Sequence, residues 1–458
     1  MERYEQQLLS LVTMAVDLPD STTSLLAADG PSAEAGLVRA SSSKSAAVRL
    51  SIAPMVDVSD RDFRMFMRLL SNKCEVWTEM LVDQALVHNA GHSGQLEKLI
   101  GFSQQEHPIV CQLGGHDPAK LAAAARIARG RGYDEINLNV GCPSSRVAGH
   151  GLMGVALMKT PELVRDCLRA IEKEVPNVSI KTRLGVDDLD TEDFTRSFLD
   201  TVLPSPTGPG SQQQPFRVIM HCRKAWLQGL SPAENRTVPP LNYPRAYKVL
   251  GDFGSRVRWT LNGGIETLWQ ARDVMMDEMA PANLEGVMIG RAAYNNPCIL
   301  HDADVYLYGC DENPITAQSR GALLEAYADY LHDRYPLESD SPLTPGTFAT
   351  SLKPTLGTFA NKVGNRAYRH AIDGLIKAHK HSGEAGPGDV IRMAMKELPE
   401  DVLWERFPPT VDVEEAERAE RQRLAETQRE QHERLRVQYA KKESTQRARL
   451  AYGRVGSS

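Results

Sequence analysis

Short apolar runs alternate with longer amphipathic segments from residue 49 to about residue 310 of the chain. Eight of these runs are rich in β-branched and other apolar side chains, which is typical of buried strands. They occupy residues 49–55, 74–80, 108–114, 135–141, 178–185, 216–222, 257–264 and 286–291. Because the runs are almost continuously apolar and a helix-length connection follows most of them, they predict a parallel sheet that is covered on its outer side.

Two of the connections carry clear helix boundaries. Residues 118–132 (PAKLAAAARIARGRG) start with proline and end with glycine, which is the usual asymmetry of helix ends. Residues 160–175 (TPELVRDCLRAIEKEV) place Thr160 at the N-cap and Pro161 at the first helical position. The pattern therefore predicts a regular alternation of strand and helix.

Eight parallel strands are the number that closes into a (β/α)8 barrel, for which about 250 residues is the usual length. A doubly wound open sheet is the alternative, and it would place a glycine-rich GxGxxG turn after the first strand. Residues 53–64 after that strand read APMVDVSDRDFR and contain no glycine. The predicted fold class is therefore α/β, a TIM barrel followed by a small all-helical domain.

The pattern divides the chain into four predicted parts. They are a disordered leader (1–48), the catalytic barrel (49–310), a helical domain (311–400) and a charged tail that is helical or disordered (401–458). Amphipathic segments at 315–335, 364–382 and 386–398 indicate the helical domain. Within the barrel, the low-complexity stretch 204–215 (PSPTGPGSQQQP) predicts a disordered surface loop.

Charge and cysteine content narrow the class of protein. The net charge of −6 gives no overall positive surface, although residues 351–382 carry six basic side chains against one acid. Seven scattered cysteines without a CxxC pair argue against a disulfide framework and a structural zinc site. No apolar run reaches the roughly 20 residues that a membrane span needs. We therefore expect a metal-free monomer in the cytoplasm, with an organelle as the alternative because of the leader.

Polar residues gather where the predicted strands end, and barrel enzymes carry their chemistry there. The fourth strand stops at Asn139, and the loop that follows it carries Cys142 beside Pro143. Glycines 149, 151 and 154 allow this loop to fold back. A thiol in this place favours a chemical role, whereas the other cysteines read as small buried side chains.

Further groups lie at the same predicted edge. Lys181 stands in an apolar strand, where a lysine is costly unless it has a partner. His221 ends the sixth strand. Asn262, Gly263 and Gly264 follow the seventh strand, and Gly290 and Arg291 follow the eighth. Glycine-rich turns at these two strands can hold a phosphate, because their backbone N–H groups are free. Taken singly, a glycine turn or a lone histidine is more often structural, and only the combination favours function.

Several segments resemble the tRNA-dihydrouridine synthases. They are APM, CQLGG, INLNVGCPSSRV, IKTRLG, HCRKAWLQGLSPAENRTVPPLNY, LNGGI and MIGRAAYNNP. RKAWLQGLSPAENR and LKPTLGTFANKVGNRAYRHAI are similar to the A subfamily in particular. The resemblance extends from about residue 50 to residue 382 and so covers most of the chain that we expect to be ordered.

The resemblance implies an FMN-dependent oxidoreductase acting on a CH–CH bond. It would reduce the C5–C6 bond of uridine at positions 20 and 20a in the tRNA D-loop, with NADPH as the reductant. Cys142 would be the general acid that protonates C5, since a cysteine thiol, with an ordinary pKa of about 8.5, is largely protonated at neutral pH. The flavin would be held by Pro54, Met55, Val56, Gln112, Lys181, His221, Asn262, Gly263, Gly264, Gly290 and Arg291.

The resemblance also implies contacts with tRNA. The target base is stacked in folded tRNA and must be extruded into the site, where Asn139 would contact it. Arg366 and Arg369, in the helical domain, would contact the tRNA backbone. Independently of the resemblance, Arg236 lies in a basic loop after the sixth strand, and we expect it to contact the same tRNA.

Two other functions are left open by the residues. A flavin-dependent dehydrogenase of a free pyrimidine or a related small molecule would share the phosphate site and the lysine, but it would not need a basic helical domain. A tRNA-binding chaperone built on an inactive barrel would need neither the thiol nor the flavin site.

Overall fold

The computed structural model describes residues 49–143, 153–204, 215–337, 343–382 and 385–419, which belong to one compact unit that begins at Ala46. The predicted leader, most of the low-complexity loop at 204–215 and the tail beyond residue 419 lie outside these described residues.

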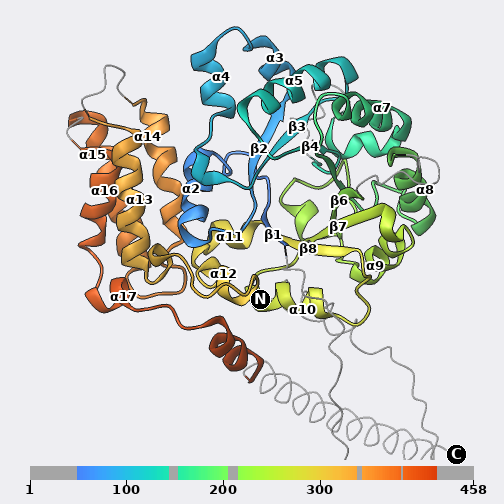
Figure 1. Ribbon diagram of the computed structural model, residues 1–458. Coiled ribbons are helices and arrows are strands. Elements are labelled where there is room, and N and C mark those ends of the chain that lie inside the picture. Colours follow the sequence, from blue (N-terminus) through green and yellow to red (C-terminus); the bar gives the residue numbers. More distant parts are fainter. Residues whose placement is uncertain (1–48, 144–152, 205–214, 338–342, 383–384, 420–458) are drawn as a thin grey trace, which may run out of the picture. The chain divides into compact units, whose positions relative to one another are not determined.

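Eight parallel strands form a barrel (Figure 1). They are β1 (Arg49–Ile52), β2 (Val76–Val82), β3 (Ile109–Gly114), β4 (Glu135–Asn139), β5 (Val178–Arg183), β6 (Phe216–His221), β7 (Val257–Asn262) and β8 (Leu284–Ile289). Neighbours pair in the order β1-β8-β7-β6-β5-β4-β3-β2. A parallel bridge between Ser51 and Glu75 joins the two outermost strands, with Ile52 N donating to the Glu75 carbonyl at 2.8 Å. The predicted TIM barrel is confirmed, and the doubly wound sheet is excluded.

Helices connect the strands on the outside of the barrel (Figure 1). They are α2 (Arg61–Leu70), α3 (Asp83–His88), α4 (Ser93–Ile100), α5 (Pro118–Arg131), α7 (Pro161–Glu172), α8 (Glu192–Val202), α9 (Tyr243–Gly251), α10 (Leu268–Met276), α11 (Arg291–Asn295) and α12 (Ala303–Tyr306). The Asp117 side chain caps α5 by accepting from Ala119 N at 2.9 Å, and Gly132 ends it at φ 96°. Thr160 occupies the N-cap position of α7 as predicted, but its hydroxyl donates to the Leu157 carbonyl instead of capping the helix.

Six of the eight strands end before the residue that the sequence pattern predicts, namely β1, β4, β5, β6, β7 and β8. β2 begins and ends two residues later than predicted, and β3 ends at the predicted residue. β1 stops at Ile52, β4 at Asn139, β7 at Asn262 and β8 at Ile289. The remaining residues of these six apolar runs therefore lie in loops at one end of the barrel. The residues predicted to hold the flavin, together with Asn139 and Cys142, stand in these loops or toward the carboxyl ends of the strands.

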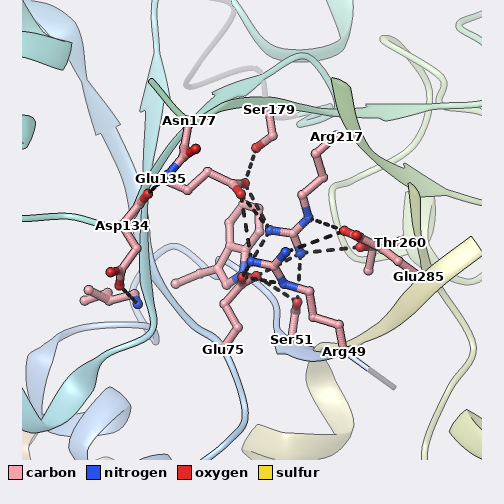
Figure 2. A network of polar contacts seen from close by, with 12 residues as sticks. Arg49, Ser51, Glu75, Asp134, Glu135, Asn177, Ser179, Arg217, Thr260 and Glu285 are labelled. Carbon is pink, nitrogen blue, oxygen red and sulfur yellow. Dashed lines mark hydrogen bonds and ion pairs between the residues drawn. The ribbon is translucent and has the colours of Figure 1, made fainter. Parts of the chain in front are cut away.

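The opposite, amino-terminal end of the barrel interior holds a buried ion network that the sequence analysis did not predict (Figure 2). Arg217, fully buried on β6, donates to Glu75 Oε1 at 2.9 Å and to Glu135 Oε1 at 3.0 Å. Its Nε lies 3.1 Å from Glu285 Oε1, and Arg49 Nε donates to Glu75 Oε2 at 2.9 Å. Buried cations and carboxylates thus compensate one another here, as burial of charge requires.

Helices follow the barrel in the chain, as predicted. They are α13 (Arg320–Arg334), α14 (Pro345–Leu352), α15 (Asn365–Ser382), α16 (Pro387–Met395) and α17 (Glu400–Trp404). The carboxylate of Asp62 on α2 accepts from Tyr330 OH at 2.9 Å and Tyr335 OH at 2.8 Å, and it pairs with Arg334 Nε at 2.9 Å. The Phe66 and Tyr327 rings pack edge-on, 4.8 Å apart. α2 is therefore one of the elements that hold these helices to the barrel.

The first part of the charged tail is a helix with one side packed against α10. Residues 410–419 are helical. Glu414 pairs with Arg272 on α10 at 2.5 Å, and Trp269 Nε1 donates to Glu417 at 3.0 Å. The segment lacks an apolar seam because polar side chains make these contacts.

Within the described ranges, every helix falls short of the length and apolarity that crossing a bilayer requires. The described His, Cys, Asp and Glu side chains form no group of three or more that could hold a metal ion.

Candidate functional site

The carboxyl ends of the strands bring most of the predicted site residues together. Asn139 Nδ2 donates to Gln112 Oε1 at 2.8 Å, which joins β4 to β3. Lys181 Nζ donates to Asn262 Oδ1 at 3.0 Å across the barrel from β5 to β7. A side chain on Gly263 would come within 3.4 Å of His221 Nε2. These contacts place five consecutive strands around one rim.

The loop of Cys142 is held by its backbone. Asn139 Oδ1 accepts from Gly141 N at 3.1 Å and from Cys142 N at 3.0 Å. The Cys142 carbonyl accepts from Val155 N at 2.9 Å, where the chain returns. Gly154 adopts φ 63°, and a Cβ there would lie 2.3 Å from the Cys142 carbonyl oxygen, so only glycine permits this return. The thiol is partly exposed and free, whereas most of the other cysteines are buried.

Lys181 is a half-buried cation whose hydrogen-bond partner among the described residues is neutral. Burial, together with the nearby positive charge of Arg183, lowers the pKa of Lys181 from 10.5 to about 7. Asn262 Oδ1 stabilises the ammonium but adds no negative charge. The ammonium would therefore gain most from an anionic ligand close to it.

His221 is a neutral imidazole in this environment. Burial, and then the positive charges of Arg183 and Lys181, hold its pKa well below the ordinary 6.5. Within the described chain, its buried Nδ1 has no hydrogen-bond partner. A buried polar atom without a partner is costly, so this nitrogen points to a group that the protein alone does not supply.

The predicted glycine turns are tight. Gly263 and Gly264 have φ values of 113° and 78°, which favour glycine. A Cβ on Gly264 would lie 2.4 Å from Leu241 Cδ1, so no larger residue fits there without displacing Leu241. The hydroxyl of Tyr243 donates to the Gly263 carbonyl and fixes the turn. Gly290 is the N-cap residue of α11, and Ala53 in the loop after β1 lies next to it.

Five cations surround this rim: Lys181, Arg183, Arg223, Arg236 and Arg291. Among the residues that the structure describes, none of the five forms an ion pair with a carboxylate. The arginines instead donate to main-chain carbonyls, as Arg291 Nη2 does to the Arg236 carbonyl at 3.2 Å. Burial and neighbouring positive charge lower the pKa values of Arg223 and Arg236. The rim is therefore electropositive and uncompensated.

Other predicted residues lie at the margin of this arrangement or away from it. Pro54 and Met55 are half-buried after β1, and Val56 is 53% exposed. Arg366 and Arg369 are exposed on α15, in the helical region, and no contact recorded among the described residues joins either to the rim.

A chain of buried amides behind the rim was missed by the sequence analysis. Gln112 Nε2 donates to Asn137 Oδ1 at 2.9 Å, Asn137 Nδ2 to Ser179 Oγ at 2.8 Å, and Ser179 Oγ to Glu135 Oε1 at 2.5 Å. Together with Asn139, this chain connects the backbone N–H groups of the Cys142 loop to the ion network. The end groups fix its direction, because N–H can only donate and an ionised carboxylate can only accept. The alternation in INLN was the available signal, since it puts both asparagines on the inner face.

Comparison with known proteins agrees with this geometry. The family model described as "Dihydrouridine synthase (Dus)" matches residues 51–344. A protein of Salmonella typhimurium named "tRNA-dihydrouridine(20/20a) synthase" is 40% identical over 76% of this chain and 95% of its own length. The Vibrio vulnificus protein of the same name is 39% identical over 77% of this chain and 98% of its own length.

Proposed function

The chain belongs to the dihydrouridine synthase family, and from this premise we propose that it is a tRNA-dihydrouridine(20/20a) synthase. Its substrate would be a uridine of the tRNA D-loop, its cofactor FMN and its reductant NADPH. The observation that carries the proposal is the rim itself, where five uncompensated cations and a free thiol converge.

The residues present fit FMN. Its phosphate is an anion, which suits a rim of cations and glycine turns that leave N–H groups open. Its ring system offers hydrogen-bonding atoms, which suits the buried, unpartnered Nδ1 of His221. We propose that Asn262, Gly263, Gly264, Gly290 and Arg291 hold the phosphate end. Pro54, Met55, Val56, Gln112, Lys181 and His221 would line the ring system. When bound and reduced by NADPH, FMN supplies the hydride for the C5–C6 bond.

The protein's own part in the chemistry is to position the base and to move a proton. Cys142 Sγ would give its proton to C5 of the uracil, and the backbone contacts of the loop would hold the sulfur in place. Lys181 would stabilise negative charge that develops nearby, because its ammonium is partly buried and lacks a carboxylate partner among the described residues.

Recognition of tRNA would use both regions of the chain. Asn139 would present its amide to the extruded base, although both ends of that amide already hold the protein's own groups. Arg236 would contact the tRNA at the rim, and the exposed Arg366 and Arg369 would contact its backbone.

Incubation of the purified flavin-bound protein with NADPH and unmodified tRNA tests the proposal, with dihydrouridine mapped by position. We expect product at positions 20 and 20a and no comparable reduction of free uracil or uridine. Efficient reduction of the free pyrimidine would instead support a small-molecule dehydrogenase. A protein that remains colourless with added FMN would contradict the enzyme altogether.

A further inference from the structure

We propose that Arg183 is a positioning residue that fixes the loop of Cys142 against the loop after β6. The proposal rests on the function proposed above, in which Cys142 is the proton donor. Arg183 is the last residue of β5 and is only 4% exposed, so it reaches the rim from inside the barrel wall.

The guanidinium group binds three main-chain carbonyls from two different loops. Its Nε donates to the Gly141 carbonyl at 2.8 Å, in the loop after β4. Its Nη1 donates to the carbonyls of Lys224 and Asn235, each at 3.0 Å, in the loop after β6. Arg183 is therefore a bridge between these two loops.

Each of the three carbonyls belongs to a direct neighbour of a residue at the rim. Gly141 precedes Cys142, Lys224 follows Arg223, and Asn235 precedes Arg236. The far side of the second loop is also rigid, because Asn235 Oδ1 accepts from Trp226 N at 2.8 Å and its Nδ2 donates to the Trp226 carbonyl at 2.9 Å. A movement of the guanidinium would therefore displace the thiol and the arginines of the second loop together.

Arginine is the side chain that this geometry requires. It presents several donors in one rigid plane, whereas a lysine ammonium could not hold the same carbonyl positions at once. Burial lowers the pKa of Arg183 to about 10, so the cation costs free energy where it stands. Arg183 stands where a cation costs free energy, and among the described residues it bonds only to backbone carbonyls. This is consistent with a role in aligning the two loops.

The test compares Arg183→Ala and Arg183→Lys with the parent enzyme. A misplacement of about 1 Å can lower a rate about 100-fold, so we expect kcat to fall by about that factor in both variants. KM for tRNA should rise by much less, because Arg236 is only one of the proposed tRNA contacts and Arg366 and Arg369 lie elsewhere. Guanidinium ion at a non-denaturing concentration should restore kcat of Arg183→Ala, and sodium chloride at equal ionic strength should not. Guanidinium should not restore Arg183→Lys, whose side chain still fills the space.

A matched control separates alignment from stability. Arg245→Ala also removes an arginine that holds main-chain carbonyls, those of Leu184 at 2.9 Å and Thr191 at 2.7 Å, but in contacts that do not include the loop of Cys142. Arg245 additionally pairs with Asp190 at 2.5 Å, so this control tests a larger loss of contacts. We expect it to keep kcat, whatever stability it loses. If it lowers kcat as much as Arg183→Ala, or if guanidinium rescues nothing, Arg183 is merely structural.

A second readout needs no tRNA and therefore holds even if the proposed substrate is wrong. In a Cys310→Ser background, Cys142 is the one partly exposed thiol of the chain. Its alkylation rate on the high-pH plateau, where the Cys142 thiol is ionised in every molecule, reports accessibility alone. We expect a severalfold rise in Arg183→Ala, reversed by guanidinium. An unchanged plateau rate would overturn the bridge between the loops. A changed rate in an enzyme that does not act on tRNA would contradict only the function.

Discussion

The two ends of the barrel interior handle buried charge in opposite ways. At the amino-terminal end, Arg217 is matched by Glu75, Glu135 and Glu285 (Figure 2). At the carboxyl-terminal end, Lys181 and its arginine neighbours have no carboxylate partner among the described residues. The first end is complete in the protein alone, and the second is complete only with an anion. Stability and chemistry are thereby separated along one set of strands, as is usual in this fold.

Cys142→Ala should have the largest effect, because it should remove activity at the carboxyl-terminal end of the barrel. A positioned acid contributes about 10²- to 10⁴-fold to a rate, so product formation on tRNA should fall by that range. FMN content, reduction by NADPH and the free energy of unfolding should stay at parent values, because the thiol makes no hydrogen bond to any of the residues that the structure describes. Cys310→Ala is the control and should keep full activity. Normal turnover of Cys142→Ala would refute the role of the thiol.

Arg217→Met should lower the stability of the protein by disrupting the amino-terminal end of the barrel interior. It leaves Glu75 and Glu135 buried without their main cation, and such a loss typically costs about 3–5 kcal/mol of the unfolding free energy. Urea denaturation measures this loss. Arg49→Met is the control and should cost less, because Arg49 is partly exposed and Arg217 still compensates the carboxylates. Equal losses in the two variants would mean that burial of the pair is not decisive.

Arg217→Met should also change how the stability of the protein depends on pH in the acid range. Burial alone would raise the pKa of Glu75, but Arg217 and Arg49 hold it at about 2, below the ordinary 4.5. This carboxylate therefore contributes stability that is fully present above pH 4.5 and is lost as the pH falls toward 2. The loss of parent stability over that window should shrink in Arg217→Met. A parallel pH profile for parent and variant would contradict the assignment.

The smallest of these effects is an uptake of less than one proton when FMN binds. The pKa of Lys181 is about 7 in the free protein instead of 10.5, so the side chain is largely neutral between these pH values. A bound anion raises that pKa again, and binding should therefore take up protons in this window. Calorimetry in buffers of different ionisation enthalpy measures the uptake. It should vanish in Lys181→Met, and its absence from the parent protein would place the anion elsewhere.

The barrel, and the residues that meet at the carboxyl ends of its strands, could be predicted from the sequence alone. Apolar runs mark buried strands whatever surrounds them, and parallel strands bring their carboxyl ends to one side, so Lys181 and Asn262 were predicted to meet although they are 81 residues apart. The ion network could not be predicted in the same way. Arg217 stands alone in the apolar run FRVIMHC, and nothing local identifies Glu75 and Glu135 as its partners.

The second limit of the sequence is that it does not show which partner a polar side chain binds. Asn139 was predicted to face the base, but its amide is engaged by Gln112 on one side and by the backbone of the thiol loop on the other. Only the register of β3 against β4 decides this, and register depends on the whole barrel. Whether the amide also reaches a base stays a prediction.

The hydrogen-bonded amides between the Cys142 loop and Glu135 all donate in the same direction. This fixed direction limits which substitutions these positions can accept during evolution. An acid in place of Asn137 would offer two acceptors where one donor is needed, and its neighbours would have to turn with it. Gln112, Asn137 and Asn139 should therefore be inherited as a block across relatives. A lineage that changed one of them should have changed the others too, which makes the block a marker that can be read from sequences alone.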